Sequence, residues 1–119
     1  MQVLAIADDT TGALEVGAQF AADGVQSFVT ARPRLAGGST ALVVDTQSRH
    51  IKPGRAADRV VRIATAAVSA GIRHVFKKTD STLRGNISAE FQALLGVFPE
   101  SVLVYVPAYP RMGRVVTGG

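Results

Sequence analysis

The sequence predicts an α/β protein with three layers: an open, mostly parallel sheet of about five strands with helices on both faces. Short aliphatic runs alternate along the chain with longer segments in which apolar residues recur every three or four positions. A polar cluster follows four of the short runs, and the length suits one hydrophobic core. We therefore expect one compact domain over residues 1–119.

The first strand and the first helix are predicted at the N-terminus. Gln2–Ala7 is an aliphatic run that stops at Asp8, which is typical of a buried parallel strand. From Thr11 the apolar spacing becomes helical, with Thr10 or Thr11 as the N-cap and Gly24 as the C-terminal stop.

The next two strands are predicted at residues 25–30 and 40–45, with a loop between them. The linking residues include Pro33 and two glycines, and they are too few for the helix that usually connects parallel neighbours. One of these two strands is therefore expected to run antiparallel at an edge of the sheet.

The second half of the chain predicts two more helices and two more strands. Pro53–Ala70 is a long amphipathic helix with proline in its first turn. A fourth strand is expected near residues 73–77, and Asn86 is expected to cap the following helix. The apolar residues 101–106 predict a fifth strand that Pro107 ends.

The composition favours a small anionic ligand. Thirteen basic residues stand against nine acidic ones, and ten of the thirteen are arginine, which grips carboxylate or phosphate in a bidentate way. Because the arginines are dispersed and tryptophan is absent, no nucleic-acid partner is expected. No cysteine is present and the two histidines are separated, so no metal site is expected either.

No targeting or membrane segment is predicted. The N-terminus begins directly with a strand, and no segment approaches the ~20 apolar residues that a spanning helix needs. We therefore expect a cytoplasmic protein without a membrane partner.

The polar clusters are predicted to meet at one edge of the sheet, because ligands of open α/β sheets bind beyond the carboxyl ends of the strands. Asp8 and Asp9 follow the first strand and can orient a hydroxyl or act as a base, although helix capping is the simpler alternative. Thr46, Ser48 and Arg49 follow the third strand and suit a hydroxylated anion, with a plain polar turn as the alternative.

The richest cluster follows the fourth strand. Gly85 precedes a helix whose first N–H groups suit an anion, and further donors surround it: Lys78, Ser81, Thr82 and Arg84. Asp80 is a second candidate base, or else it neutralises a lysine in a solvated loop. Arg114 belongs to the last cluster and is either a ligand contact or a surface charge.

Together these segments resemble the N-terminal domain of the four-carbon acid sugar kinase family, which includes threonate, erythronate and 3-oxo-tetronate kinases. The resemblance covers nearly the whole chain and rests on four motifs: Ala7–Ala13, Asp45–Arg49, Lys77–Asn86, and Pro107–Pro110 with Gly113 and Arg114. Thr10 stands where the family usually has leucine, and Glu15 where a smaller Asp or Asn is common.

The resemblance implies that this domain binds the sugar acid. In the family a C-terminal domain binds ATP, with magnesium, and closes over the cleft. Family members are several-fold longer than this chain. We therefore expect the substrate-binding half of the kinase, with little activity alone, which acts with a separate nucleotide-binding chain or as a homodimer.

Phosphoryl transfer requires that the enzyme position the acid and aim one hydroxyl. We expect Arg49, Lys78 and Arg84 to surround the carboxylate or the incoming phosphate, and Asp8 or Asp9 to orient the acceptor hydroxyl. The hydroxyls of the substrate are expected to bond to the hydroxyl side chains, which are Ser48, Ser81 and Thr82. Arg114 is expected to face the nucleotide domain.

Two alternatives remain open at this point. A phosphoacceptor receiver domain has about this length, an acidic pair after its first strand and an aspartate after its third, a position that Asp45 fits. Such a domain needs a lysine after the fifth strand, where this chain has Pro107. The second alternative is an anion-binding module without catalysis.

Overall fold

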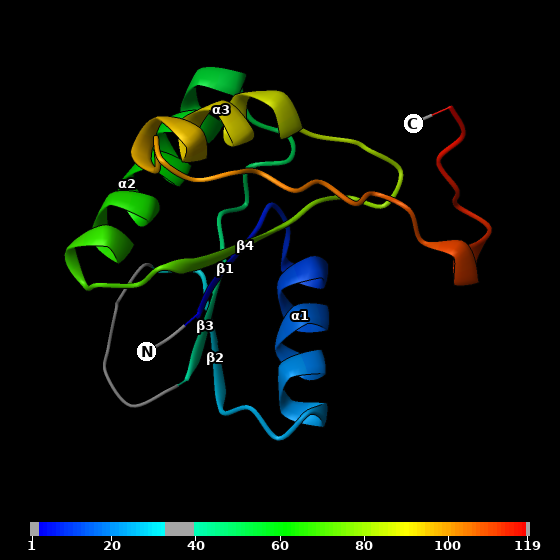
Figure 1. The fold of residues 1–119 in the computed structure, drawn as a ribbon, viewed down its shortest axis with the longest axis horizontal. Helices are drawn as coiled ribbons and strands as arrows, with labels where there is room; N and C mark the ends of the chain where they lie inside the picture. Colours follow the sequence, from blue (N-terminus) through cyan, green and yellow to red (C-terminus); the bar gives the residue numbers. More distant parts are fainter. Residues whose placement is uncertain (1–2, 33–39, 119) are drawn as a thin grey trace.

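The computed structural model describes residues 3–32 and 40–118. Its core is a parallel sheet in the order β2-β3-β1-β4, with α1 on one face and α2 and α3 on the other (Figure 1). The elements are β1 (Val3–Ala7), α1 (Thr10–Ala22), β2 (Ser27–Thr30), β3 (Ala41–Asp45), α2 (Pro53–Ser69), β4 (His74–Lys78), α3 (Ile87–Val97) and the short 3-10 helix η1 (Pro110–Met112). The predicted open, three-layer α/β class is confirmed.

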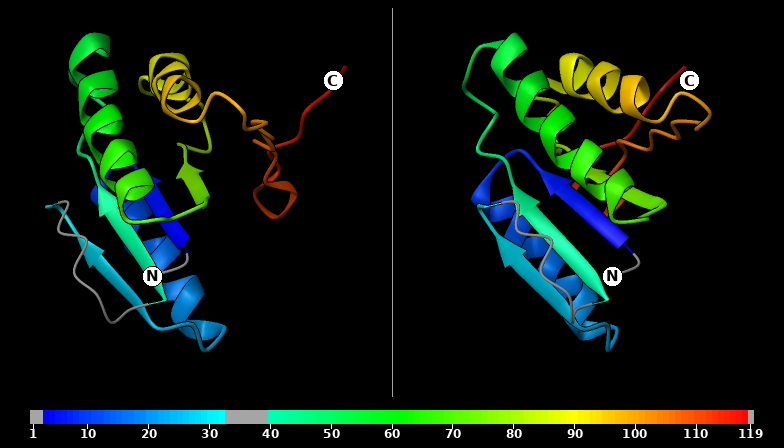
Figure 2. Two further views of the ribbon diagram at one scale, coloured as in Figure 1. Left: turned by 60° about the vertical axis from the view of Figure 1, so that its left-hand side comes forward. Right: turned by 90° about the vertical axis from the view of Figure 1, so that its left-hand side faces the viewer.

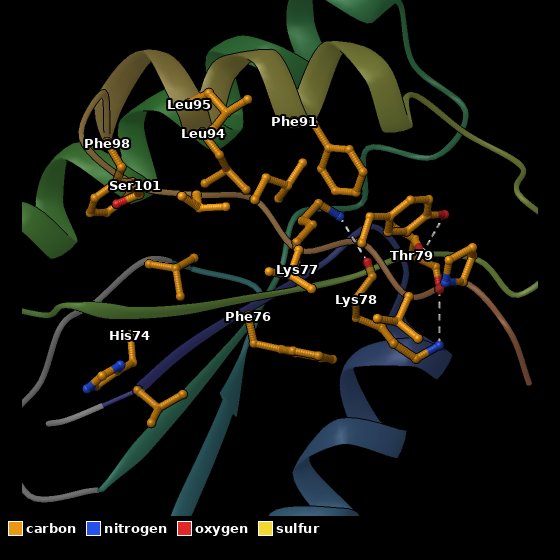
Figure 3. Close-up of a pocket in the computed structure, with 18 of the residues that line it drawn as sticks. His74, Phe76, Lys77, Lys78, Thr79, Phe91, Leu94, Leu95, Phe98 and Ser101 are labelled. Carbon is orange, nitrogen blue, oxygen red and sulfur yellow. Dashed lines mark hydrogen bonds between the residues drawn. The ribbon is translucent and has the colours of Figure 1, made fainter. Parts of the chain in front are cut away.

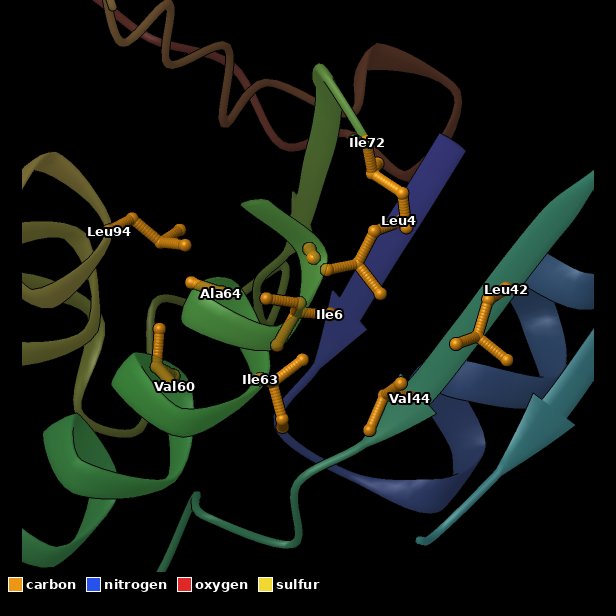
Figure 4. Packing of buried hydrophobic residues seen from close by; sticks show 10 residues of the cluster. Leu4, Ile6, Leu42, Val44, Val60, Ile63, Ala64, Ile72 and Leu94 are labelled. Carbon is orange, nitrogen blue, oxygen red and sulfur yellow. The ribbon is translucent and has the colours of Figure 1, made fainter. Parts of the chain in front are cut away.

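The two central strands form the core because both of their faces are apolar. On one face the side chains of β1 and β3 pack against α2, as Figure 4 shows for Ile6 and Val44 beside Ile63. On the other face the small side chains of these strands pack against Ala13 and Val16 of α1. The continuous aliphatic runs in the sequence reflect this burial on both sides.

The first helix lies unusually close to the sheet. A Cβ on Gly17 would come within 2.5 Å of the Val29 side chain on β2, so only glycine allows this approach. Asp9 is the N-cap of α1, and its side chain accepts a hydrogen bond from the Gly12 N–H. The predicted cap, Thr10 or Thr11, is therefore wrong by one or two residues, because the Asp9 side chain already accepts the hydrogen bond of the Gly12 N–H.

The other two helices lie on the opposite face and against each other (Figure 2). Pro53 begins α2, as predicted, and Gly71 with φ +73° follows its end. Asn86 stands at the N-cap position of α3, but its side chain makes no capping bond. Its amide donates instead to Ser48 O at 2.8 Å and to Ile51 O at 2.9 Å, which anchors the segment after β3.

The predicted fifth strand is not formed. Residues 101–106 have no strand pairing, although Tyr105 packs edge-on against the Phe91 ring at a centroid distance of 4.9 Å. Val102, Val104 and Val106 are 75–87% exposed. An apolar run becomes a buried strand only when both of its faces are covered, and within the described residues this run is covered on one side.

The expectation of an antiparallel edge strand is also wrong, because β2 pairs with β3 in parallel. An extended chain spans up to roughly 3.3 Å per residue, so the link from Ala31 to Thr40 is long enough to return along one short strand without a helix. Most of the predicted loop, residues 33–39, lies outside the described residues. In the described ranges, no helix has both the length and the apolar character needed to cross a membrane.

Candidate functional site

The predicted site residues gather where the strands of the parallel sheet end. After β1 the chain turns to α1 on one face, and after the neighbouring β3 it turns to α2 on the other. Such a switch leaves a crevice at the carboxyl ends of the two strands, which is where open α/β sheets bind ligands. Five charged side chains fill this region and form what we call the carboxylate–arginine cluster: Asp8, Asp9, Arg49, Asp80 and Arg84.

Arg49 is the centre of the carboxylate–arginine cluster. Its Nε and Nη2 donate to the two carboxylate oxygens of Asp8, each at 2.9 Å, and its Nη1 donates to Asp9 at 2.6 Å. Asp80 lies 3.7 Å from Nη1. The hydrogen bonds to Asp8 raise the pKa of Arg49 further above its ordinary value. Asp8 is only 2% exposed, so its charge depends on this one guanidinium.

Asp9 is the most accessible carboxylate of the three. One of its oxygens caps Gly12 N at 2.9 Å, and the other accepts from Arg49. Its side chain is 27% exposed, whereas those of Asp8 and Asp80 are 3% and 8% exposed. A ligand at this edge therefore meets Asp9 before it meets the other two.

Asp80 organises the loop that follows β4. Its carboxylate accepts from the backbone N–H groups of Thr82 and Arg84, from the Thr82 hydroxyl, and from the Arg84 guanidinium. The guanidinium of Arg84, followed by the other donors, holds the pKa of Asp80 well below its usual range. A carboxylate so stabilised as the anion is a poor general base.

Three backbone positions in this region have a left-handed conformation that favours glycine, and they are Gln47 with φ +47°, Leu83 and Gly85. Leu83 has φ +62° inside the loop that Asp80 ties together. Gly85 has φ +96°, and a Cβ there would lie 3.1 Å from an Asp8 oxygen and 3.4 Å from the Arg49 side chain. Gly85 therefore lets this loop approach the Asp8–Arg49 pair, which differs from the predicted role of presenting N–H groups to an anion.

The hydroxyls after β3 are turned toward the interior. Ser48 is 0% exposed and its Oγ donates to Glu90, while Thr46 donates to Ala7 O at 2.8 Å. Asp45 is also buried, and it accepts from the Thr10 hydroxyl at 2.6 Å. These three side chains hold the segment after β3 in place and do not line the rim of the site. A receiver domain needs an accessible phosphoacceptor at the position of Asp45, so the burial of Asp45 argues against that alternative.

Lys78, Ser81 and Arg114 lie at the periphery of the carboxylate–arginine cluster. Lys78 Nζ pairs with Glu15 at 3.2 Å. Arg114 Nη1 donates to Ser81 Oγ at 2.5 Å, so the last predicted motif meets the loop after β4. The predicted residues are thus brought to one edge, as an inner group tied to one another and an outer group closer to solvent.

A large cavity lies beside the carboxylate–arginine cluster and not within it. A volume of about 680 Å³ separates β4 and α3 from residues 101–109, and Lys78 and Ser81 reach its border (Figure 3). Its walls are largely apolar and include Phe76, Phe91 and Leu94. This space is a gap next to the unpaired residues 101–106, whereas the chemistry of a hydroxylated anion is better matched by the charged side chains of the carboxylate–arginine cluster.

A metal site is not formed by the residues described. No group of three or more His, Cys, Asp or Glu residues within 3–32 and 40–118 is arranged to hold an ion. Every carboxylate oxygen of Asp8, Asp9 and Asp80 already accepts a hydrogen bond from nitrogen. These three carboxylates lie around the Arg49 guanidinium, which balances part of their charge.

Sequence reasoning missed a buried ion pair beneath the site. Lys77 on β4 and Glu90 on α3 lie 2.8 Å apart, with side chains only 3% and 1% exposed. Glu90 occurs between Ile87 and Leu94 at helical spacing, on the face that packs inward. A charged residue within an apolar stripe of a helix indicates a buried polar contact. The position of Glu90 in the sequence therefore already pointed to such a contact.

An open parallel α/β sheet with charged side chains gathered at its carboxyl edge is the arrangement that ligand-binding α/β domains have in common. Residues 3–119 match the model of a family described as the sugar-binding N-terminal domain. The chain belongs to this family, and the resemblance drawn from its motifs is confirmed.

Relatives with assigned activities match the whole chain but extend well beyond it. The chain is 38% identical to a D-threonate kinase of Cupriavidus necator over 100% of its own length and 29% of the relative. A D-erythronate kinase of Heliobacterium modesticaldum is 36% identical, over 98% of this chain and 28% of the relative. The chain thus spans less than a third of the length of these kinases.

A solved structure has the same fold. A domain of unknown function from Bordetella bronchiseptica, with bound citrate and as a domain-swapped dimer, superimposes with a TM-score of 0.76 at 30% identity. The superposition covers 82% of this chain and 26% of that one.

Proposed function

We propose that residues 1–119 form the sugar-acid-binding domain of an ATP-dependent kinase that phosphorylates a four-carbon sugar acid such as threonate, erythronate or 3-oxo-tetronate. The carboxylate–arginine cluster is the observation that supports this most directly. It gathers charged groups from three separate segments at the edge where α/β sheets take ligands. Relatives named as D-threonate and D-erythronate kinases carry the same domain.

Within this proposal the inner residues are a framework. Asp8, Arg49 and Asp80 satisfy one another's charges, and Gly85 allows the loops to meet. The remaining framework residues are buried or tied to Asp80, and they are Thr46, Ser48 and Thr82. Their task is to hold the rim in a fixed geometry, because positioning contributes much of the catalysis in phosphoryl transfer.

The outer residues are the proposed ligand contacts. Arg84 has a side chain that is 64% exposed, and with Lys78 and Arg114 it supplies cationic donors for a carboxylate. Ser81 offers a hydroxyl beside them. Asp9 is the carboxylate placed to accept a hydrogen bond from the acceptor hydroxyl and to orient it.

We place ATP and magnesium on a nucleotide-binding domain outside this sequence. Within the described residues no group of three or more His, Cys, Asp or Glu side chains is arranged to hold an ion, and the sequence has no glycine-rich loop ending in Gly-Lys-Ser/Thr. The chain by itself is therefore expected to bind and orient the acid in the cytoplasm without transferring phosphate. A separate nucleotide-binding chain or a second copy is the proposed partner.

Calorimetric titration tests the binding role. D-Threonate, D-erythronate and their L-isomers are titrated into the chain and into Arg84→Ala, with Arg62→Ala on the exposed side of α2 as a control of equal charge change. We expect binding of at least one acid and about tenfold weaker binding with Arg84→Ala alone, as for a lost charged hydrogen bond. Heat from none of the four acids, or equal losses in both variants, contradicts the proposal.

A further inference from the structure

The buried pair of Lys77 and Glu90 is connected to the carboxylate–arginine cluster by hydrogen bonds. Lys77 Nζ lies 2.8 Å from one Glu90 oxygen, and the other Glu90 oxygen accepts a hydrogen bond from the Ser48 hydroxyl. Lys77 Nζ also donates to Lys78 O at 2.9 Å. In Figure 3 Lys77 extends from β4 on the side of α3, whereas Phe76 extends from the other side. Both charges are therefore fully partnered within the protein interior.

Ser48 connects the buried pair to Arg49, the next residue along the chain, because its own backbone is fixed by hydrogen bonds. Its N–H and that of Arg49 both donate to Asp8 O, at 2.9 and 3.2 Å. Its carbonyl accepts from Asn86 at 2.8 Å, so the Ser48 backbone is held on two sides and its side chain on a third. The Arg49 guanidinium begins one residue from this fixed point.

We propose that Lys77 and Glu90 are positioning residues, which fix Ser48 and thereby hold the Arg49 guanidinium against Asp8 and Asp9. This inference rests on the proposed function for its purpose, because a fixed Arg49 is what keeps Asp9 in place at the rim. The hydroxyl of Ser48 is the link between the buried pair and the site. Neither Lys77 nor Glu90 touches the ligand.

A purely structural role for the pair is less well matched to the geometry. Two buried charges are often no more stabilising than apolar residues of the same volume, because they lose their hydration. Packing of α3 on α2 and the sheet is already supplied by Leu94 and its apolar neighbours. An apolar pair would leave the Ser48 hydroxyl with the Thr46 hydroxyl, at 2.7 Å, and would remove the charged acceptor on α3 that ties Ser48 to this helix.

The test reads the Arg49 Nε–H directly. In ¹H–¹⁵N spectra this proton should exchange slowly, because it is bonded to the buried carboxylate of Asp8. Ser48→Ala, which leaves the Lys77–Glu90 pair intact, and the apolar replacement Lys77→Met with Glu90→Leu are both expected to speed its exchange at least tenfold. Leu94→Ala is the control, since it weakens the packing of α3 without touching Ser48.

The outcomes separate positioning from stability. Unchanged Arg49 exchange in Ser48→Ala, or in the folded replacement of Lys77 and Glu90, overturns the proposal, as does equal acceleration in folded Leu94→Ala. Should the double replacement not fold, Ser48→Ala carries the test by itself. The readout needs no ligand, so absence of sugar-acid binding in the wild-type chain would contradict the proposed function while this measurement still decides the positioning role.

Discussion

The two sides of β4 differ in how far the chain pairs its charged groups and covers its apolar side chains. Toward β1, the carboxylate–arginine cluster pairs charges from three loops, and no buried side-chain nitrogen or oxygen in the described residues lacks a hydrogen-bond partner. Away from β1, residues 101–106 leave valines that are 75–87% exposed beside a mainly apolar gap. The first region is specified by this chain alone, whereas the second has the character of a surface that another element covers.

The largest effect on the free energy of unfolding is expected from Arg49→Ala in the carboxylate–arginine cluster. The substitution removes the bidentate partner of the buried Asp8 carboxylate, and breaking a buried pair in this way typically costs about 3–5 kcal/mol. Urea unfolding measures the change, and Arg62→Ala serves as the control. A loss below about 1 kcal/mol, which is usual for surface ion pairs, would show that the carboxylate–arginine cluster is not buried in solution.

A smaller loss is expected from Gly85→Ala. The φ of +96° and the 3.1 Å approach of the added Cβ to Asp8 both oppose a side chain, at a cost of about 1–3 kcal/mol. Gly54→Ala at the start of α2 is the matched control, because a Cβ there meets nothing within 4 Å. Thermal unfolding of the two variants should differ in midpoint, and equal midpoints would contradict the described loop geometry.

The pH dependence of stability should identify Asp80. Because the folded state lowers its pKa below the ordinary 3.8, its contribution is complete above that pH and is lost as the pH falls toward the lowered value. Asp80→Asn should therefore reduce the stability gained between pH 3 and pH 6 by about 1 kcal/mol, since the exposed Arg84 weakens the interaction. The measurement is urea unfolding at both pH values. The same change in unfolding free energy between pH 3 and pH 6 in the wild type and in the variant would contradict this prediction.

The smallest effect on stability is expected in the other region. Val104→Lys changes a side chain that is 79% exposed and should alter the unfolding free energy by less than about 0.5 kcal/mol. The same change should reduce self-association, which light scattering after size-exclusion chromatography measures. Loss of more than 1 kcal/mol would show that residues 101–106 are packed as a strand after all.

The sequence predicts the fold well where the pattern is local. The aliphatic runs of β1 and β3 and the stripe of α2 agree with the structure within one or two residues, because both faces of those strands are apolar. The run at 101–106 has the same composition, yet whether it pairs depends on what covers it. What covers residues 101–106 depends on parts of the protein far away in the sequence, so local patterns do not predict whether this strand pairs.

The sequence predicts which residues gather at the carboxyl edge of the sheet, but not which of them bind one another. Strand ends in a parallel sheet place Asp9, Arg49 and Arg84 at one edge, as the sequence analysis expected. Which carboxylate each arginine binds depends on loops 41 residues apart in the case of Asp8 and Arg49. Residue type alone favours an external ligand for Arg49, and only the folded backbone reveals that its donors are already engaged.

The double attachment of Asp8, whose carbonyl accepts two N–H groups while its carboxylate holds the Arg49 guanidinium, has a kinetic consequence. The segment after β3 has no way to swing aside without breaking all of these bonds together. Encounter with a ligand should therefore be a single-step process, with an observed rate in stopped-flow mixing that rises linearly with ligand concentration and shows no slow phase.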